Sequence, residues 1–407
     1  MMKHKLFFRL DGEEIEPELI EKFNLRKDSR NIRYSYSKKC EVLNFVGFII
    51  QDNMLLISLP KHYTYRDNLV NMTETDIYLL FNVLLRDQVK NVKNYIGEIE
   101  NYESNFPFKS FFSIYRYYTN YGLYKETRTI TKPGYNKKIE WKDTIRKSTN
   151  IISGNNLIYI PFYSKEIKKE HVFLTECMVY AISYTLKNYS MFVKGKIPTQ
   201  NFNNFDFFSN REYVLSKLKK IYSEVFKDID KQLIRDLIDF FSFVPEGGNT
   251  TIKHYNFELI WESMVEKYLN DFFVEVVDEG LVFSKQKTNE KFNFKKEVFY
   301  VDKAHPRNRL EPDHYFNDGD QQFIFDSKYY SKVHDLNHKQ VAYYTFLRKK
   351  ANQTYNALIV PTENESSPLP TPLHFELKES FYAHPDDQIK IWEYYLNMAD
   401  AMENYIK

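Results

Sequence analysis

Runs of apolar residues define the first elements of the chain. Residues 44–50 and 54–59 are apolar on either side of Gln51-Asp52-Asn53, which predicts a β-hairpin with a short polar loop. Thr73-Glu-Thr-Asp76 then offers an N-cap, and apolar residues follow it at helical spacing from Ile77 to Leu85. We therefore expect strands followed by a helix in the N-terminal part.

The middle of the chain mixes a turn, a short strand and helices. Thr131-Lys-Pro-Gly134 predicts a turn, and residues 156–162 predict a short strand. Helical periodicity extends over about 171–190 and 210–243. Pro245-Glu-Gly-Gly-Asn249 separates this region from the next apolar-periodic segment, which indicates a domain boundary.

The C-terminal part has a different order of elements. We expect a helix with an apolar stripe over 257–269, strands near 272–284 and 292–301, a hairpin formed by 312–316 and 321–328, a helix over 336–350, a buried strand over 355–360 stopped by Pro361, a strand near 373–378 and a helix near 385–405. This order is typical of a layered α/β domain. The predicted fold class is α/β, with an α+β N-terminal region and with domains over 1–125, 126–245 and 246–407.

Composition narrows the functional classes. With 407 residues, 43% of them hydrophobic, the chain can bury a large core. No apolar run reaches the roughly 18–20 residues that span a bilayer, and Arg9 and Asp11 interrupt the N-terminal apolar stretch. We therefore expect a cytoplasmic protein without membrane contact. Cys40 and Cys177 alone cannot build a disulfide framework, a four-cysteine zinc site or an iron–sulfur cluster.

Glycine usage excludes nucleotide chemistry by the chain itself. The 11 glycines include no G-x-G-x-x-G and no G-x-x-x-x-G-K-[ST] pattern. Any step driven by a nucleoside triphosphate would therefore need another protein.

The net charge of +2 hides one basic region. Residues 125–170 contain eleven Lys and Arg against five acidic residues, with Tyr124, Tyr135, Trp141 and Tyr159 in or beside this stretch. Such a stretch can lie along a phosphate backbone. A solvated face of a lysine-rich protein is the alternative.

Three charged residues stand at the open end of the predicted C-terminal hairpin. Asp313 lies on its first strand, and Asp326-Ser-Lys328 ends the second. Side chains on a strand repeat every two residues, so Asp326 and Lys328 share one face, and Asp313 can lie beside Asp326. Two carboxylates can hold Mg²⁺, and a lysine can offset charge on a phosphoryl group, which suits phosphodiester hydrolysis. A surface hairpin with an ordinary Asp–Lys pair is the alternative.

Two helices add candidates. Gln340 and Tyr344 are four residues apart on the helix after the hairpin, so both project from one face toward the carboxylates, unless that face is plain core. On the helix at 257–269, Glu258 and Glu262 flank the apolar stripe and Glu266 points away. We expect Glu262 to reach the metal, and solvated glutamates are the alternative.

These residues resemble a nuclease family. The chain is similar to the PD-(D/E)xK nucleases of the RecB-like type at Glu262, Pro312-Asp313, Asp326-Ser-Lys328 and Gln340-x-x-x-Tyr344. The resemblance implies Mg²⁺ binding by the three acids, a catalytic role for the lysine, and DNA contact by Gln340 and Tyr344. Asp326 stands where many members have Glu, and the cysteines of the iron–sulfur branch are absent.

A second resemblance covers most of the chain. The chain resembles the LlaJI restriction endonuclease family, which is similar to McrC nuclease subunits. The matching segments are Phe45-Val-Gly-Phe48, Leu59-Pro-Lys-His-Tyr63, Thr131-Lys-Pro-Gly134, Ile139-Glu-Trp141, Thr144-Ile145 and Phe257 with Trp261-Glu262. The resemblance implies a McrB-like AAA+ GTPase as partner, which agrees with the missing P-loop.

We therefore predict a Mg²⁺-dependent endonuclease subunit of a bacterial restriction system that defends against phage. It would cleave foreign double-stranded DNA with a McrB-like GTPase, and a homodimer would cut both strands. The first 245 residues would recognise DNA, dock the GTPase, or both. A RecB-like repair exonuclease is one alternative. A non-catalytic adaptor that stimulates its GTPase is another, although the intact Asp313, Asp326 and Lys328 argue against it.

Overall fold

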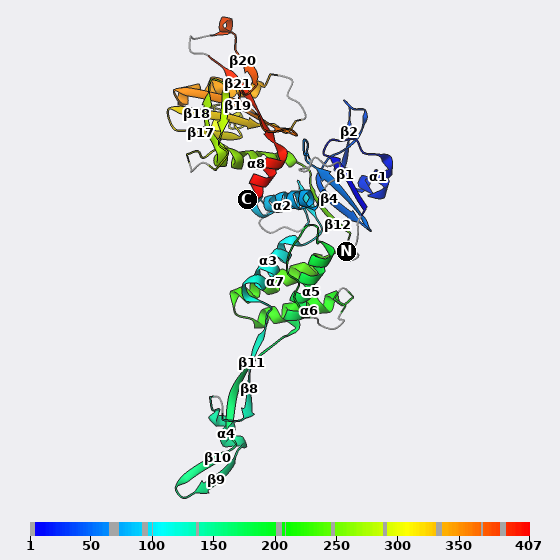
Figure 1. The fold of residues 1–407 in the computed structure, drawn as a ribbon, viewed down its shortest axis with the longest axis vertical. Helices are drawn as coiled ribbons and strands as arrows, with labels where there is room; N and C mark the ends of the chain where they lie inside the picture. Colours follow the sequence, from blue (N-terminus) through cyan, green and yellow to red (C-terminus); the bar gives the residue numbers. More distant parts are fainter. Residues whose placement is uncertain are drawn as a thin grey trace. The chain divides into compact units, whose positions relative to one another are not determined.

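The computed structural model describes residues 5–407 except 65–72, 92–96, 100, 136–137, 201–205, 208, 246–248, 288–290, 331–335, 368 and 383–387. The chain forms two compact units (Figure 1). The composite unit joins Met1–Phe106 to Gly247–Lys407, and the inserted unit is Pro107–Glu246. Among the described residues, no helix is long and apolar enough to cross a membrane.

A mixed sheet carries the N-terminal half of the composite unit. Its strand order is β1-β5-β4-β12-β7-β6. The bounds are β1 Lys5–Leu10, β4 Val46–Gln51, β5 Met54–Leu59, β6 Gly97–Ile99, β7 Tyr102–Ser104 and β12 Thr250–His254. The predicted hairpin is confirmed, because β4 and β5 pair antiparallel with Gln51 opposite Met54. Two smaller helical elements, α1 (Pro17–Lys22) and η1 (Leu25–Lys27), and the hairpin β2 (Ile32–Ser35) with β3 (Cys40–Leu43) accompany it.

The inserted unit starts and ends beside two neighbouring strands. Strand β7 precedes it, β12 follows it, and the two pair antiparallel in one sheet. An insertion whose ends lie close together leaves the host sheet intact. The predicted boundary at 245–249 falls at one of these junctions. The earlier junction lies at Phe106–Pro107, not near residue 125, because helix α3 (Phe108–Tyr121) packs on helices of the inserted unit.

The predicted helix cap at Thr73 is confirmed. Helix α2 spans Glu74–Asn91. The Asp76 backbone N–H donates to Thr73 Oγ1 (3.3 Å), and the Thr73 backbone N–H donates to Asp76 Oδ2 (2.8 Å). This reciprocal pair satisfies donors that the first turn of a helix leaves free.

The C-terminal half contains a five-stranded sheet in the order β17-β18-β19-β21-β20. Its strands are β17 His314–Asn317, β18 Gln321–Ser327, β19 Gln353–Thr362, β20 Leu373–Glu376 and β21 Lys390–Asn397. The three central strands are parallel, and the edge strands β17 and β20 run antiparallel to their neighbours. The carboxyl ends of the three parallel strands β18, β19 and β21 therefore lie at one edge of the sheet, where the candidate site is.

Helices and aromatic side chains cover the two faces of this sheet. Helix α9 (His338–Leu347), followed by η3 (Arg348–Lys350), packs on one face, where Gln322 Nε2 donates to Leu347 O (2.8 Å). On the other face, Phe273 meets Phe323 and Phe325 at ring-centroid distances of 5.2 and 5.5 Å. Phe273 begins β13 (Phe273–Val277), which pairs with β14 (Gly280–Phe283) after helix α8 (Phe257–Phe272). Short elements β15 (Phe299–Tyr300), β16 (Arg309–Leu310) and η4 (Glu379–Phe381) complete this half.

The structure corrects three expectations about this half. The strand expected near 292–301 is limited to β15 and an isolated bridge between Lys295 and Tyr315. Strand β19 was expected to stop at Pro361, but it continues to Thr362. Its pairing with β18 ends at Ile359, which lies opposite Ser327. Pro361 therefore has no partner on the β18 side that would need a backbone N–H, which proline lacks. The helix expected near 385–405 is helical only over α10 (Met398–Ile406). The segment before it is the buried strand β21, in which Ile391, Trp392 and Tyr394 pack in the sheet.

The inserted unit is a helical body with a long two-stranded ribbon. Its helices are α3, α5 (Phe173–Asn188), α6 (Arg211–Glu224) and α7 (Asp228–Phe243), so the stretch expected as one helix over 210–243 is two. The ribbon pairs β8 (Glu126–Pro133) with β11 (Tyr163–Glu170). Thr131-Lys-Pro therefore belongs to a strand and not to the expected turn. Only Gly134 leaves the strand, with a φ of +156°.

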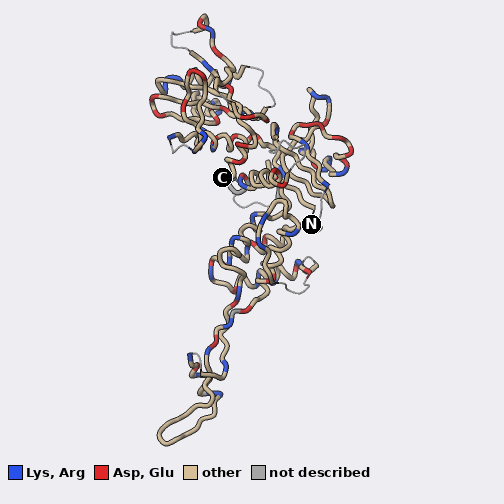
Figure 2. The backbone as a smooth tube through the Cα atoms, viewed as in Figure 1, with Lys and Arg blue, Asp and Glu red and all other residues tan. Residues whose placement is uncertain are grey.

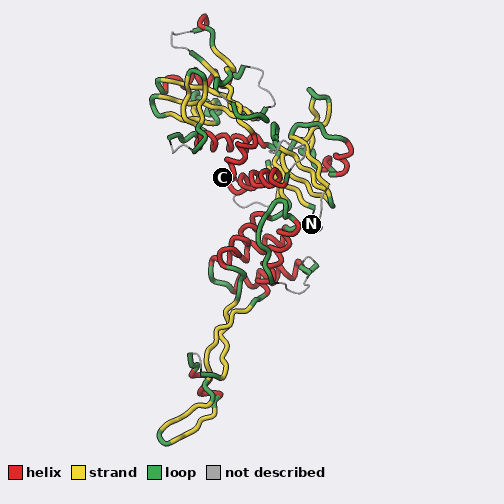
Figure 3. The backbone as a smooth tube through the Cα atoms, viewed as in Figure 1, coloured by secondary structure: helices red, strands yellow, loops and turns green. Residues whose placement is uncertain are grey.

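The ribbon leads to helix α4 (Trp141–Lys147) and a terminal hairpin, here called the arm tip (Thr149–Ile160). Strands β9 (Thr149–Ser153) and β10 (Asn156–Ile160) form it and pair only with each other among the described strands. The arm tip contains no Lys, Arg, Asp or Glu (Figure 2). Helices and mixed sheets alternate through the chain (Figure 3), which confirms the α/β class.

The close packing around Gly47 predicts that a larger residue at this position destabilises the protein. A Cβ at Gly47 would lie 2.0 Å from Ile252 O on the neighbouring strand β12, and its φ is +147°. Gly47→Ala should therefore separate β4 from β12 and lower the free energy of unfolding by about 3 kcal/mol. Gly154→Ala in the arm tip has the same backbone restriction without a neighbour and should cost only about 1 kcal/mol. Thermal unfolding followed by calorimetry checks this, and equal losses would contradict it.

Candidate active site

The hairpin register brings two aspartates together. His314 pairs with Phe325, and the same register continued by one residue puts Asp313 opposite Asp326. Opposite residues of an antiparallel pair point to one face. Asp313 Oδ2 accepts a hydrogen bond from the Ser327 backbone N–H (3.1 Å), which fixes this carboxylate at the end of β18.

Both carboxyl groups are buried. Asp313 is 8% exposed and Asp326 is 0% exposed. Burial, together with the neighbouring Asp313 carboxylate, raises the pKa of Asp326 above its usual range. Asp326 Oδ1 accepts no hydrogen bond, although Lys339 Nζ forms an ion pair with it at 3.5 Å.

Two lysines offset this negative charge. Lys328 lies two residues after Asp326 on the same face, and its Nζ donates to Asp326 Oδ2. Lys339 on α9 places its Nζ 3.5 Å from Asp326 Oδ1. Burial opposes the charged form of Lys339, yet Asp326 and Tyr343 raise its pKa above the usual value. The site is therefore a pair of acids held between two ammonium groups.

A third lysine, Lys296, links Glu262 on helix α8 to Asp313. Lys296 Nζ lies 3.4 Å from Glu262 Oε2 and 3.8 Å from Asp313 Oδ1. Glu258, one turn earlier, lies instead in the electrostatic surroundings of Asp11 and Tyr329. Of the two flanking glutamates, Glu262 is thus the one that shares a cation with Asp313.

Gln340 and Tyr344 both turn inward from α9. Tyr344 packs with Leu358, Val360 and Ile391 in an apolar cluster. Gln340 is 0% exposed, and neither atom of its amide has a hydrogen-bond partner. Both side chains are therefore buried, and the DNA contact that the family resemblance implies stays a prediction.

Sequence reasoning missed Lys296, Lys339 and the buried His314. His314 Nε2 lies 2.6 Å from Ser327 Oγ, and burial lowers the pKa of His314 to about 3, so the ring is neutral. Lys339 could have been found, because it precedes Gln340 on a helix already expected beside the hairpin. Nothing in the local pattern points to Lys296, since its segment has little regular structure.

The arrangement fits a magnesium ion bound by two carboxylates. Within the described ranges, no group of three or more His, Cys, Asp or Glu side chains is arranged to hold a metal. The structure brings Asp313 and Asp326 together, whereas Lys296 lies between Asp313 and the third expected ligand, Glu262. Mg²⁺ commonly uses one or two carboxylates and takes its other ligands from water and phosphate. The oxygen of Asp326 that accepts no hydrogen bond is a suitable ligand.

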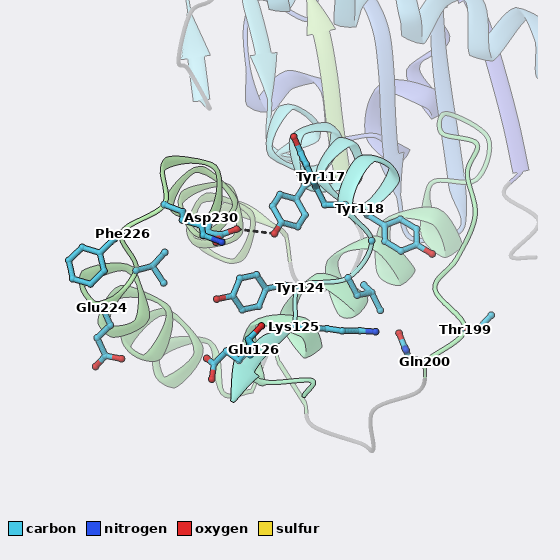
Figure 4. Close-up of a pocket in the computed structure, with 16 residues that line it drawn as sticks. Tyr117, Tyr118, Tyr124, Lys125, Glu126, Thr199, Gln200, Glu224, Phe226 and Asp230 are labelled. Carbon is cyan, nitrogen blue, oxygen red and sulfur yellow. Dashed lines mark hydrogen bonds between the residues drawn. The ribbon is translucent and has the colours of Figure 1, made fainter. Parts of the chain in front are cut away.

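A cavity of about 830 Å³ lies elsewhere, in the inserted unit (Figure 4). Tyr117, Tyr121 and Tyr124 line it, and the Tyr117 hydroxyl donates to Asp230 Oδ1 (2.9 Å). It contains none of the predicted site residues. Its lining is aromatic and mixed in charge, with the acids Glu126, Glu224 and Asp230 and the lysines Lys125 and Lys227.

Several lysines of the basic stretch at 125–170 pair with acids. On the ribbon, Lys132 Nζ lies 3.0 Å from Glu166 Oε2, and Lys165 pairs with Glu140. Lys147 Nζ lies 3.1 Å from Asp143 Oδ2. DNA contact by this stretch remains a prediction, and Lys137 lies outside the described residues.

Comparison with known proteins finds assemblies from Thermococcus gammatolerans. A chain of the refined half-complex from a tetradecameric assembly of McrB AAA+ hexamers with bound McrC aligns with 99% of this chain and 98% of its own length, at 13% identity and a TM-score of 0.37. A chain of the cryo-EM structure of the McrBC complex aligns with 65% and 88%, at 11% identity and a TM-score of 0.25. No family model and no curated protein matches. At these scores, function has to be derived from the site itself.

The raised pKa of Asp326 predicts a pH-dependent stability. A carboxyl group whose pKa is higher in the folded state weakens folding as the pH rises above its unfolded value of about 3.9. In metal-free buffer, Asp326→Asn should therefore raise the unfolding temperature at pH 7.5, by roughly 1–2 °C per kcal/mol relieved. The increase in unfolding temperature should become smaller toward pH 4, where the Asp326 carboxyl group of the wild type is protonated and as neutral as the Asn side chain of the variant.

Asp318 on the same hairpin provides the opposite control. Backbone N–H groups of Gln321 and Asp320 lower its pKa, so Asp318→Asn should lower the unfolding temperature at pH 7.5. Calorimetry across pH checks both variants. A lower unfolding temperature of Asp326→Asn at pH 7.5 would contradict the raised pKa of the buried Asp326 carboxyl group.

Proposed function

We propose that the protein is a Mg²⁺-dependent DNA endonuclease subunit of a restriction system, working with a McrB-like AAA+ GTPase. The observation that carries the proposal is the buried pair Asp313–Asp326 with Lys328 and Lys339 at the carboxyl edge of three parallel strands. Burying two acids side by side opposes folding, so a site that keeps them is best explained by function.

Each residue of the site would have a different role in phosphodiester hydrolysis. Asp313 and Asp326 would hold Mg²⁺, which polarises the phosphoryl group and acidifies a bound water. Lys328 would then leave Asp326 for the attacking water or for the charge that builds on the phosphoryl oxygens. His314 is neutral and buried, and it contacts Ser327, whose backbone N–H donates to Asp313.

DNA would approach along the exposed lysines of the site. Lys296 and Lys339 are 46% and 51% exposed at their side chains, so their ammonium groups can exchange a carboxylate for a backbone phosphate. Gln340 is fully buried on the same helix as Lys339, so it would not contact the DNA backbone in this conformation.

The arm tip supports a protein partner. Its apolar side chains cover both faces of an isolated hairpin: Ile152 is opposite Leu157, and Ile151 is opposite Ile158. Ile152 is 79% exposed and Leu157 is 52% exposed. A two-stranded hairpin is marginally stable by itself, and exposed apolar clusters mark interaction sites. We assign the arm tip to the AAA+ partner, because an uncharged surface does not fit a phosphate backbone.

The arm tip and the acid pair together argue against the two alternative functions. A self-sufficient repair exonuclease has no need of an apolar docking hairpin, and a non-catalytic adaptor has no need of a buried acid pair. A partner-dependent nuclease uses both features. It would cut both strands as a homodimer.

The first test is cleavage by site variants. Wild-type protein with a McrB-like AAA+ GTPase should cut plasmid DNA with Mg²⁺ and GTP, on methylated or unmethylated substrate. Asp313→Ala, Asp326→Ala and Lys328→Ala should each lower the cleavage rate at least about 100-fold, because each removes a group that acts on the phosphate. Gel assays measure the rate, and circular dichroism verifies folding.

Helix α8 offers a matched set of controls. Glu262→Gln should lower the rate more than Glu258→Gln or Glu266→Gln, because only Glu262 shares Lys296 with Asp313. Wild-type cleavage by well-folded Asp326→Ala would end the nuclease assignment.

The second test concerns the arm tip. Ile152→Asn combined with Leu157→Asn should abolish binding to the AAA+ protein and any GTPase stimulation, because it removes an exposed cross-strand apolar pair. Asn150→Ser combined with Asn155→Ser changes the same hairpin without changing its apolar surface, and it should bind normally. Light scattering of the mixed proteins measures binding, and unaltered binding by the first variant would place the docking surface elsewhere.

A further inference from the structure

The N-terminal sheet reaches the candidate site through the ends of two parallel strands. Strands β1 and β5 are parallel, so Asp11 and Lys61, which follow them, lie at the same edge. The Asp11 backbone N–H donates to Leu59 O (2.8 Å), and Lys61 Nζ lies 3.8 Å from Asp11 Oδ2. This acid–lysine pair faces Tyr329, the residue directly after Lys328.

Tyr329 is held by groups from both halves of the composite unit. Its hydroxyl accepts the Lys61 backbone N–H (2.8 Å), and Lys61 Nζ lies 4.5 Å from the ring centroid. The ring of Phe257, at the start of α8, lies 5.5 Å away on the C-terminal side of the unit. Burial raises the pKa of both Tyr329 and Asp11, so the phenol keeps its proton as a donor toward Asp11.

Two neighbouring contacts reach the same edge of the C-terminal sheet. His62 Nε2 lies 3.2 Å from Tyr330 O, and Thr64 Oγ1 donates to Glu363 O (3.0 Å). Tyr330 follows β18, and Glu363 follows β19. Residues 61–64 therefore bind the carboxyl ends of two adjacent parallel strands, which is where the acid pair and Lys328 lie.

These contacts hold the backbone of Lys328 from both sides. Its backbone N–H donates to Ile359 O (2.9 Å) and continues the ladder between β18 and β19. The next residue is fixed by its buried side chain, because Tyr329 is only 5% exposed. The Lys328 side chain therefore starts from a fixed backbone position, from which its Nζ reaches Asp326 Oδ2.

We propose that Tyr329 is a positioning residue for Lys328, and that residues 61–64 of the N-terminal half thereby set the geometry of the nuclease site. This inference rests on the proposed function, and it adds that the N-terminal sheet regulates nuclease activity through the position of Lys328. A partner that moves the N-terminal sheet changes the placement of the catalytic lysine. The N-terminal half is then part of the active-site support and not only a docking module.

Tyr329→Phe tests this proposal, because it removes one hydroxyl and keeps the ring. With the AAA+ partner, Mg²⁺ and GTP present, kcat should fall roughly 10–100-fold, since small misplacements of a catalytic group have effects of that size. KM for DNA and the calorimetric affinity for Mg²⁺ should stay at wild-type values. Asp11→Asn, which leaves Tyr329 in place, should give a smaller loss of kcat with the same unchanged KM.

Tyr330→Phe is the matched control. Its side chain is 57% exposed, and the contact from His62 uses only its backbone oxygen, so kcat should not change. If Tyr329→Phe keeps the wild-type kcat while Asp326→Ala is inactive, the positioning role is wrong and the nuclease assignment stands. A parallel loss of Mg²⁺ affinity and DNA binding would also overturn it, because that is a general structural defect.

Hydrogen exchange provides a readout that does not need cleavage. Exchange of the backbone amides at 327–330 should be faster in Tyr329→Phe than in the wild type, whereas amides of β20 should be unchanged. Unchanged exchange at 327–330 would refute the positioning role even if the wild-type protein does not cut DNA. Absence of cutting by the wild type under every partner condition would refute the proposed function instead.

Discussion

The burial of Asp313 beside Asp326 is the constraint on which the rest of the site depends. Two carboxylates that share a dry position repel each other and lose hydration, and both effects raise the pKa of Asp326. The fold offsets this with Lys328 and Lys339 on Asp326 and with Lys296 on Asp313. Three elements are needed to bring these cations together: the end of β18, helix α9 and the segment before β15.

The surrounding architecture follows from the need to hold that edge still. Phenylalanines on the other face of β18 fix the strand, with Phe325 0% exposed. Helix α9 closes the face that carries the acids. The N-terminal sheet adds a third support through Lys61 and Tyr329. A cation bound by both carboxylates, as we propose, would weaken their repulsion and stabilise this arrangement.

Local periodicity was enough to predict the acid pair. The two-residue repeat of a strand put Asp326 and Lys328 on one face, and the hairpin turn put Asp313 opposite Asp326. The Thr73 cap and the apolar stripe of α8 were predictable for the same reason, because each depends on residues within a few positions of one another. Glu262 was predicted beside the acids, but the cation between it and Asp313 was not.

The remaining features depend on contacts between distant segments. Strand β21 was expected to be helical, since nothing local reveals that Trp392 and Tyr394 lie in a sheet next to β19. Strand β12 joins the N-terminal sheet only after the whole inserted unit. Lys296 and Lys61 reach the site through tertiary packing, which a linear pattern does not encode. The apolar arm tip was hidden by its basic flanks, because charge was summed over 125–170 as a whole.

The measurement that tests the central claim most directly is a crystal structure of the full chain with Mn²⁺ in place of Mg²⁺, with data collected at the manganese absorption edge. An anomalous peak between Asp313 and Asp326, with both carboxylates as ligands and Lys328 turned from Asp326, is the predicted result. No anomalous peak at this position under saturating Mn²⁺, in crystals with an open site, would contradict the proposal that the two aspartates form the metal centre of a nuclease.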